Sequence, residues 1–200
     1  MNFSKELSLI IIKNIAFIDG GAVEAVQTAV FKAINARLEK RIKALGGWKG
    51  RYELITGAAD ETAFAPAAWP ESQDGKYRVC YKLTAMLTDE NTYWLSSALG
   101  VNCCKLCLRL WVHGALGGRS KGEIERKMLM VGTTDAARAA GMVVDTDNTV
   151  YLPFVFFPET LVTEYPTVEK TLAPLDAAVD KLLQVNPLID AAVQELAAKR

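Results

Sequence analysis

Between Val23 and Leu45, apolar residues recur at steps of three and four positions. This spacing places them on one face of a helix, and the glycines Gly46 and Gly47 that follow are typical of a helix end. Residues 7–18 form the longest apolar run, but their β-branched isoleucines suit a strand as well as a helix. We therefore predict one long helix near the N-terminus and leave the type of the preceding segment open.

After this helix the pattern changes to an alternation of apolar and polar residues, which is typical of half-buried strands. The alternation is clearest in residues 77–84 and 103–112. Residues 149–157 are apolar on both faces, as in a central strand that is covered twice. Residues 48–56 and 93–99 are two further predicted strands. Because the connections are short and polar, we expect neighbouring strands to be antiparallel.

Helices return in the second half of the chain. Ser120 and Glu123 have the spacing of a capping box, which predicts the start of a helix. An alanine-rich helix over residues 135–140 is expected next. Residues 142–144 and 149–157 then form a predicted hairpin, because a run of turn-forming residues separates them.

The tail of the chain is predicted to hold a pair of helices. Thr167 is the expected N-cap of the first, and Pro187 is expected to start the second, because proline is favoured at the first helical position. Together the elements predict an α+β fold, a single domain in which long helices from both ends of the chain pack on an antiparallel or mixed β-sheet. Its parts are an N-terminal helical segment (1–46), a sheet region (48–157) and the C-terminal helical pair (167–200).

Composition narrows the class of protein. The chain has 200 residues, of which 50% are hydrophobic, so it can bury one core and is not intrinsically disordered. No apolar run reaches the roughly 20 residues that span a bilayer, and we expect no membrane partner. The four cysteines are too crowded for a disulfide framework, so we expect a cytoplasmic protein.

Charge disfavours one class of partner. The 23 basic and 23 acidic side chains give a formal net charge of zero, whereas nucleic-acid modules usually carry a basic excess. The charges are unevenly spread, with residues 1–50 and 101–150 net positive and the other two quarters net negative. Acidic and basic faces on one small chain favour pairing with another protein or with a second copy.

The cysteines and the single histidine suggest a zinc site at first sight. On a strand, however, Cys103 and Cys107 would lie about 13 Å apart, too far to share one ion. His113 would lie about 20 Å from Cys107 along the same strand, so the two cannot act as base and nucleophile. We therefore expect unreactive structural thiols at Cys80, Cys103 and Cys107, with no metal and no cofactor.

A glycine-rich stretch over residues 114–122 lies between a predicted strand and a predicted helix. Backbone N–H groups and the helix dipole favour anions at such a position. The stretch departs from the phosphate-loop motif, because Glu123 stands where that motif needs lysine. A plain connecting loop is the alternative to an anion site. The anion-binding candidates are Gly117, Gly118, Arg119, Ser120 and Lys121.

Acidic residues give a second candidate site. Asp60 and Glu61, if the fold brings them near Lys82, would supply the carboxylates and the lysine of a metal-dependent hydrolase. Asp145 and Asp147 start like a calcium loop, but the glycine and the glutamate that such a loop requires are missing, so we interpret them as turn residues.

Two functions of different class follow from these observations. Because no residues pair as nucleophile and base, we favour a non-enzymatic protein-interaction module that acts through surface complementarity. It would be a small accessory, regulatory or inhibitor protein of a bacterium or phage. The alternative is a divergent metal-dependent hydrolase or nuclease that uses Asp60, Glu61 and Lys82 together with the anion-binding loop.

Surplus apolar surface predicts a homodimer. The apolar run 7–18, the two-faced strand 149–157 and the alanine-rich tail exceed what one core obviously needs. Arg41 falls within the apolar helical stripe and needs a partner inside the fold or across an interface. The expected interface residues are Ile11, Arg41 and Ala192. In the alternative, the same elements sandwich the sheet of a monomer.

Overall fold

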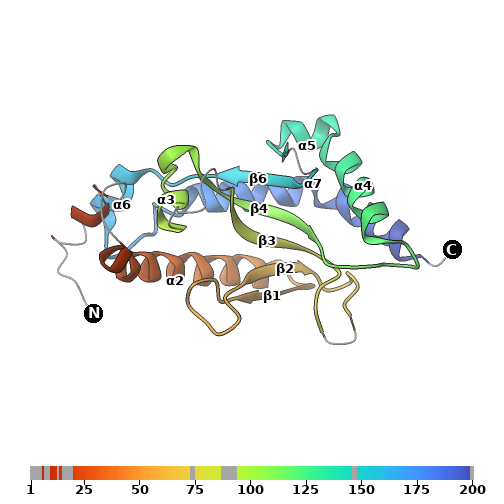
Figure 1. Ribbon diagram of the computed structural model, residues 1–200, viewed down its shortest axis with the longest axis horizontal. Coiled ribbons are helices and arrows are strands. Elements are labelled where there is room, and N and C mark those ends of the chain that lie inside the picture. Colours follow the sequence, from red (N-terminus) through yellow and green to blue (C-terminus); the bar gives the residue numbers. More distant parts are fainter. Residues whose placement is uncertain are drawn as a thin grey trace.

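The computed structural model of the chain describes residues 6, 10–12, 14, 20–72, 75–86, 94–145 and 148–198 (Figure 1). It confirms the α+β fold. Within the described residues, six strands form an antiparallel sheet in the order β1-β2-β3-β4-β6-β5. The strands are β1 (Trp48–Tyr52), β2 (Thr62–Pro66), β3 (Val79–Met86), β4 (Lys105–Val112), β5 (Val143–Val144) and β6 (Val150–Phe154).

Two long helices, α2 and α7, come from opposite ends of the chain, as the sequence predicted. The capping box between Ser120 and Glu123 is present at the start of α4, and the alanine-rich helix and the β5–β6 hairpin also form. The helices are α2 (Gly20–Ala44), α3 (Trp94–Ala98), η2 (a 3-10 helix, Val101–Cys103), α4 (Lys121–Gly132), α5 (Asp135–Ala139), α6 (Pro158–Glu164) and α7 (Ala173–Ala197).

One face of the sheet, here called the inner face, carries the apolar core. Phe64 and Tyr81 are register partners on this face, and both are fully buried. Helix α2 covers the β1–β2 end, where the Thr62 hydroxyl donates to Asn35 Oδ1 at 2.6 Å. Helix α7 covers the middle, where the Tyr81 hydroxyl donates to Asn186 Oδ1 at 2.7 Å. The two long helices therefore share the inner face.

Ion pairs tie α2 to α7. Arg37 donates to the Asp176 carboxylate through Nη2 at 2.8 Å and through Nε at 3.1 Å, a two-pronged geometry that fixes both side chains. One turn further along α2, Arg41 pairs with Asp180 and lies 3.9 Å from Asp176. The partner that the sequence required for Arg41 is thus inside the fold.

The tail differs from the prediction, because α7 runs unbroken through Pro187. Proline removes one helical hydrogen bond. Contacts on both sides of the proline hold the helix. Asn186 accepts from Tyr81 of β3, and Asp190 Oδ1 accepts from the buried indole Nε1 of Trp69, in the bend that follows β2, at 2.7 Å. These tertiary contacts offset the lost hydrogen bond, and no second helix starts here.

The structure differs from the sequence predictions at three further places. Residues 93–99, predicted as a strand, contain helix α3, whose Leu95, Ser96, Ser97 and Ala98 are all buried, so no periodic exposure marks its type. Thr167 caps no helix. Strand β6 lies second from the sheet edge rather than at the centre. Residues 7–18 lie mostly outside the described residues, although residues 10–12 are helical.

No helix in the described part of the chain combines the length and the apolar character needed to cross a membrane.

Replacing Asn186 with alanine is expected to lower the free energy of unfolding by about 1–3 kcal/mol, because the Tyr81 hydroxyl would stay buried without its acceptor. Gln184 is an exposed amide on the same helix, so Gln184→Ala is the matched control and should change the free energy by less than about 0.5 kcal/mol. Urea denaturation followed by circular dichroism measures both. Equal losses would show that the Tyr81–Asn186 bond does not hold α7.

Candidate functional site

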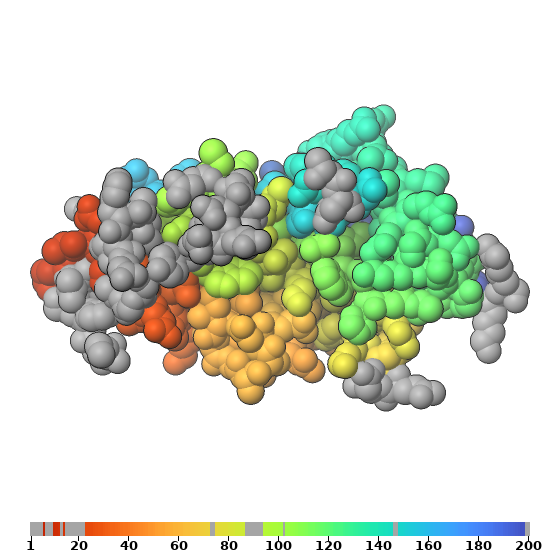
Figure 2. All heavy atoms as spheres, viewed as in Figure 1, coloured from red at the N-terminus to blue at the C-terminus, as the bar shows by residue number. Residues whose placement is uncertain are grey.

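The opposite face of the sheet, here called the outer face, is polar over β3 and β4. The register places Lys82 opposite Arg109 and Cys80 opposite Trp111. Tyr151 on β6 lies on the other side of Arg109. Figure 2 looks onto this face: β3 and β4 reach the surface between the β1–β2 region and α4, while α7 is almost hidden behind them. The outer face is where side chains that do not serve the core are presented.

Cations gather around one ring on this face. The Arg109 guanidinium carbon lies 4.4 Å from the centroid of the Trp111 ring, and the Nζ atoms of Lys82 and Lys121 lie 5.5 and 5.8 Å from it. Arg109 also lies 5.5 Å from the centroid of Tyr151. Trp111 is only half-buried. We call these five residues the Trp111 cluster.

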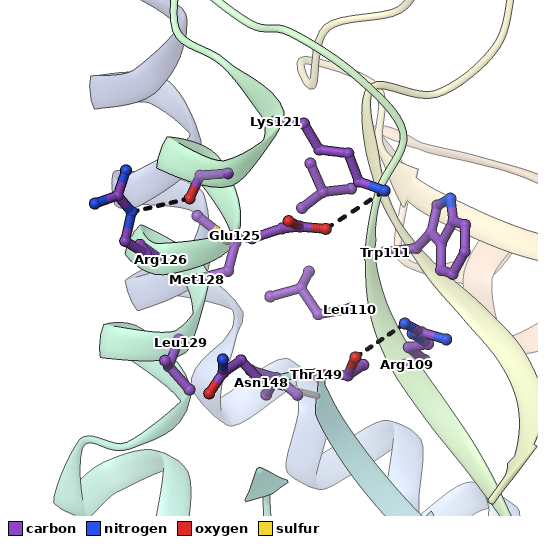
Figure 3. Close-up of a pocket in the computed structure, with 13 residues that line it drawn as sticks. Arg109, Leu110, Trp111, Lys121, Glu125, Arg126, Met128, Leu129, Asn148 and Thr149 are labelled. Carbon is purple, nitrogen blue, oxygen red and sulfur yellow. Dashed lines mark hydrogen bonds and ion pairs between the residues drawn. The ribbon is translucent and has the colours of Figure 1, made fainter. Parts of the chain in front are cut away.

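The cations of the cluster are held by polar partners. Arg109 Nη2 donates to the Thr149 hydroxyl at 2.9 Å. Lys82 pairs with Glu61 at 2.8 Å, and Lys121 lies 3.5 Å from Glu125. Figure 3 shows the Lys121 and Arg109 contacts. Glu61 and Glu125 are partly solvent-exposed, so each pair contributes little to stability, on the order of 0–1 kcal/mol. The carboxylates orient the two lysines beside the ring.

A hollow of about 270 Å³ lies between α4 and β4 (Figure 3). On its β6 side β4 is paired only as far as Leu110, whereas Trp111 and Val112, which line the hollow, are paired with β3 alone. At its far end α4 packs closely on the sheet, since a Cβ on Gly132 would lie 2.7 Å from the Val150 side chain. Helix α4 thus stands beside the end of β4 and closes one side of the hollow.

A second hollow, of about 400 Å³, lies on the β1 side of Trp111. Arg51, Lys76 and His113 are among its lining residues, as are Tyr77 and Trp111 itself. Trp111 lines both hollows. One half-buried ring therefore forms part of the wall of two open depressions.

Most residues of the predicted anion-binding loop make structural contacts within the chain. Arg119 Nη1 donates to the carbonyl oxygens of Leu196 and Ala198 at 2.7 and 3.1 Å, at the C-terminal end of α7. The side chain and the N–H of Ser120 take part in the capping box. The backbone of Gly117 lies against the Leu196 carbonyl, while Gly118 has open space around it. Of the five candidates, Lys121 is the one that lines the α4–β4 hollow, and anion binding by the loop stays a prediction.

The predicted hydrolase residues are only partly brought together. Glu61 and Lys82 form the ion pair described above. Asp60 lies in a loop at a positive φ of 42°, and its Oδ1 accepts a hydrogen bond from the Ile55 N–H at 2.7 Å. Among the described residues, no three His, Cys, Asp or Glu side chains are grouped so that they could hold a metal ion.

The predicted interface residues do not lie on an open surface. Ile11 is 1% exposed and Ala192 is 4% exposed, because both pack into the core of their own chain. Arg41 is engaged by Asp176 and Asp180. The homodimer itself stays a prediction, but these three residues do not form an exposed patch for it.

The cysteines are free thiols with different surroundings. Burial raises the pKa of Cys80 and of Cys107 to about 12. Cys104 is also buried, whereas Cys103 is exposed in η2, just before β4 rather than on it. Thiolate, which is the reactive form, is therefore suppressed at the two strand cysteines.

Sequence reasoning missed Arg109, Trp111 and Tyr151 as candidate site residues. The alternation along residues 103–112 already placed Arg109 and Trp111 on the polar side of their strand. The missing information was the register, which sets Lys82 and Tyr151 beside them, and the placement of α4, which brings in Lys121.

Gly117→Ala is expected to destabilise the chain by at least about 2 kcal/mol more than Gly118→Ala. Both glycines have positive φ, so both variants share the conformational cost, but only a Cβ at position 117 would collide with a backbone oxygen, that of Leu196. Urea denaturation of the two variants gives the difference. Similar stabilities would show that the loop does not clamp the end of α7.

Cys103 is expected to be the cysteine that reacts first with a disulfide reagent at about pH 8. With a pKa of about 12, Cys80 and Cys107 hold only roughly one thiolate in ten thousand molecules at that pH. The Cys103→Ser variant should therefore lose the fast phase, and guanidinium should expose the remaining thiols. A fast phase that persists in Cys103→Ser would contradict the burial of the other three.

Comparison of the chain with protein-family models, with curated proteins and with solved structures finds no match. No relative supplies a fold name, a ligand or a site residue. The Trp111 cluster and its two hollows are therefore interpreted from their own geometry and charge.

Proposed function

We propose that this chain is a non-catalytic binding module that recognises an anionic partner through the outer face of β3 and β4. The observation that carries the proposal is the Trp111 cluster, in which three cationic groups lie within 6 Å of one half-buried ring. Glu61 and Glu125 offset the repulsion between these like charges in the free chain. An anionic partner adds negative charge beside the same cationic groups and gains affinity from their attraction.

The cluster is organised before any partner binds. Arg109 lies near both Trp111 and Tyr151, and its guanidinium is also anchored on Thr149. A side chain that is already fixed loses little conformational entropy on binding. Lys82 and Lys121 are paired with single carboxylates, which an incoming anion can replace or join. These features support recognition of an anionic partner by a pre-organised surface.

The kind of partner follows from the same surface. The sequence favours a protein partner or a second copy of the chain, and an acidic protein surface would satisfy the cluster. The C-terminal quarter of this chain is itself net negative, so a second copy also offers acidic groups. Both stay predictions within the broader proposal of an anionic macromolecule.

The metal-dependent hydrolase remains the second candidate because one observation favours it. Glu61 and Lys82, predicted from the sequence to belong together, do form a close pair on the outer face. Asp60, the other predicted carboxylate, is instead bound to the loop backbone. This candidate requires metal-dependent cleavage that Glu61→Gln abolishes, whereas the binding module requires no turnover.

The double variant Lys82→Gln/Lys121→Gln is expected to elute from a heparin column at a lower salt concentration than the unmodified chain, by about 0.1 M or more. The control is Lys40→Gln/Lys181→Gln, which removes two exposed lysines of α2 and α7 and so has the same net charge. It should elute like the unmodified chain. If both double variants shift equally, or neither shifts, the outer face is not the surface that recognises anions.

A further inference from the structure

Cation and ring pairs recur across the outer face. Lys49 Nζ lies 5.6 Å from the centroid of Tyr77, in the segment that leads into β3. Trp111 on β4 is surrounded by the three cationic groups of its cluster, and Tyr151 on β6 shares Arg109 with it. From β1 to β6, positive groups and aromatic rings therefore follow one another across the strands rather than along one of them.

Basic side chains outnumber acidic ones among the described residues that line the two hollows. Among the described residues that line them, five are Lys or Arg and two are Glu. The cations belong to four different segments, so the excess spans the face and is not the property of one element. They are Arg51, Lys76, Arg109, Lys121 and Arg126, and the carboxylates are Glu61 and Glu125.

The shape of the site selects among anionic ligands. Two depressions share one ring in their walls, and both are open to solvent, which suits a chain-like ligand better than a small enclosed molecule. An acidic peptide offers carboxylates but few planar groups. Duplex DNA keeps its bases stacked inside. A single-stranded nucleic acid alternates phosphates with exposed bases, which is the alternation that this face presents.

On these observations we infer that the outer face binds single-stranded nucleic acid, with Trp111 as the stacking platform and the cations of the Trp111 cluster and of the two hollows as phosphate contacts. The inference rests on the proposed function, because it names the class of anion that the Trp111 cluster receives. A net charge of zero does not oppose it. Binding responds to the local potential of a surface rather than to the net charge of the whole chain.

The experiment is fluorescence anisotropy with a labelled oligothymidylate of about 12 nucleotides. Trp111→Leu keeps an apolar side chain but removes the ring, and it should weaken binding at least tenfold, as should Lys82→Gln/Lys121→Gln. Trp111→Phe restores a ring and should bind within about threefold of the unmodified chain. Raising NaCl from about 50 to about 200 mM should weaken binding roughly tenfold, as expected for two or three phosphate contacts.

Matched controls separate the face from general effects. Phe157 is an aromatic residue that is 61% exposed outside the outer-face cluster, so Phe157→Ala should leave the affinity unchanged. Lys40→Gln/Lys181→Gln should do the same. Circular dichroism confirms that each variant is folded. If Trp111→Leu does not fold, Trp111→Phe and the double lysine variant still test the ring and the charges separately.

The outcomes distinguish the inference from the proposed function. A polyglutamate peptide of equal charge that binds as tightly as the oligonucleotide, or an oligonucleotide affinity insensitive to Trp111→Leu, overturns the inference. In the first case the proposal of an anion-binding face stands. Duplex DNA that binds better than the single strand overturns the inference in the same way. No binding of any of the three, together with unchanged heparin elution in Lys82→Gln/Lys121→Gln, overturns both.

Discussion

The structure depends on the docking of α7 against one face of the sheet. Two buried aromatic residues of the core, Tyr81 and Trp69, each donate a hydrogen bond to α7. Their acceptors, Asn186 and Asp190, lie one helical turn apart on that helix. Buried donors of this kind are costly to leave without a partner, so the helix has one favourable position along the strands. Because strand side chains alternate, fixing the apolar face in this way leaves the other face of β3 and β4 free for polar residues.

The same docking positions the elements around the candidate site. The C-terminal end of α7 receives Arg119 from the loop before α4, and Lys127 of α4 pairs with Glu195 of α7 at 2.7 Å. Lys121 at the start of α4 is therefore held beside Trp111 by contacts that lie outside the cluster. The contacts that stabilise the fold and the proposed recognition surface are therefore separated in space: the inner face and α7 hold the first, and the outer face carries the second.

Local patterns explain which parts of the fold could be predicted. The long helix α2, the capping box of α4 and the alternation of β4 are properties of neighbouring residues, and the sequence displays them directly. The continuity of α7 through Pro187 depends on partners more than one hundred positions away in Tyr81 and Trp69. The site divides in the same way: Arg109 and Trp111 share a predictable strand face, but their meeting with Lys82 and Lys121 requires register and helix placement. Asp60 has a positive φ, and its carboxylate binds the loop backbone instead of joining Glu61 and Lys82. No pattern in the sequence predicts this backbone conformation.

The contact between Gly132 and Val150 has a consequence for the α4–β4 hollow. Helix α4 packs closely on the sheet at this glycine, near its C-terminal end. The hollow lies between β4 and the earlier part of the helix, from Lys121 to Leu129. Gly132 itself lines no part of the hollow, but Val150, which a Cβ at position 132 would meet, does. A larger side chain at position 132 would therefore displace Val150 or α4 and change the shape of the hollow, while Arg109, Trp111 and Lys121 keep their identity.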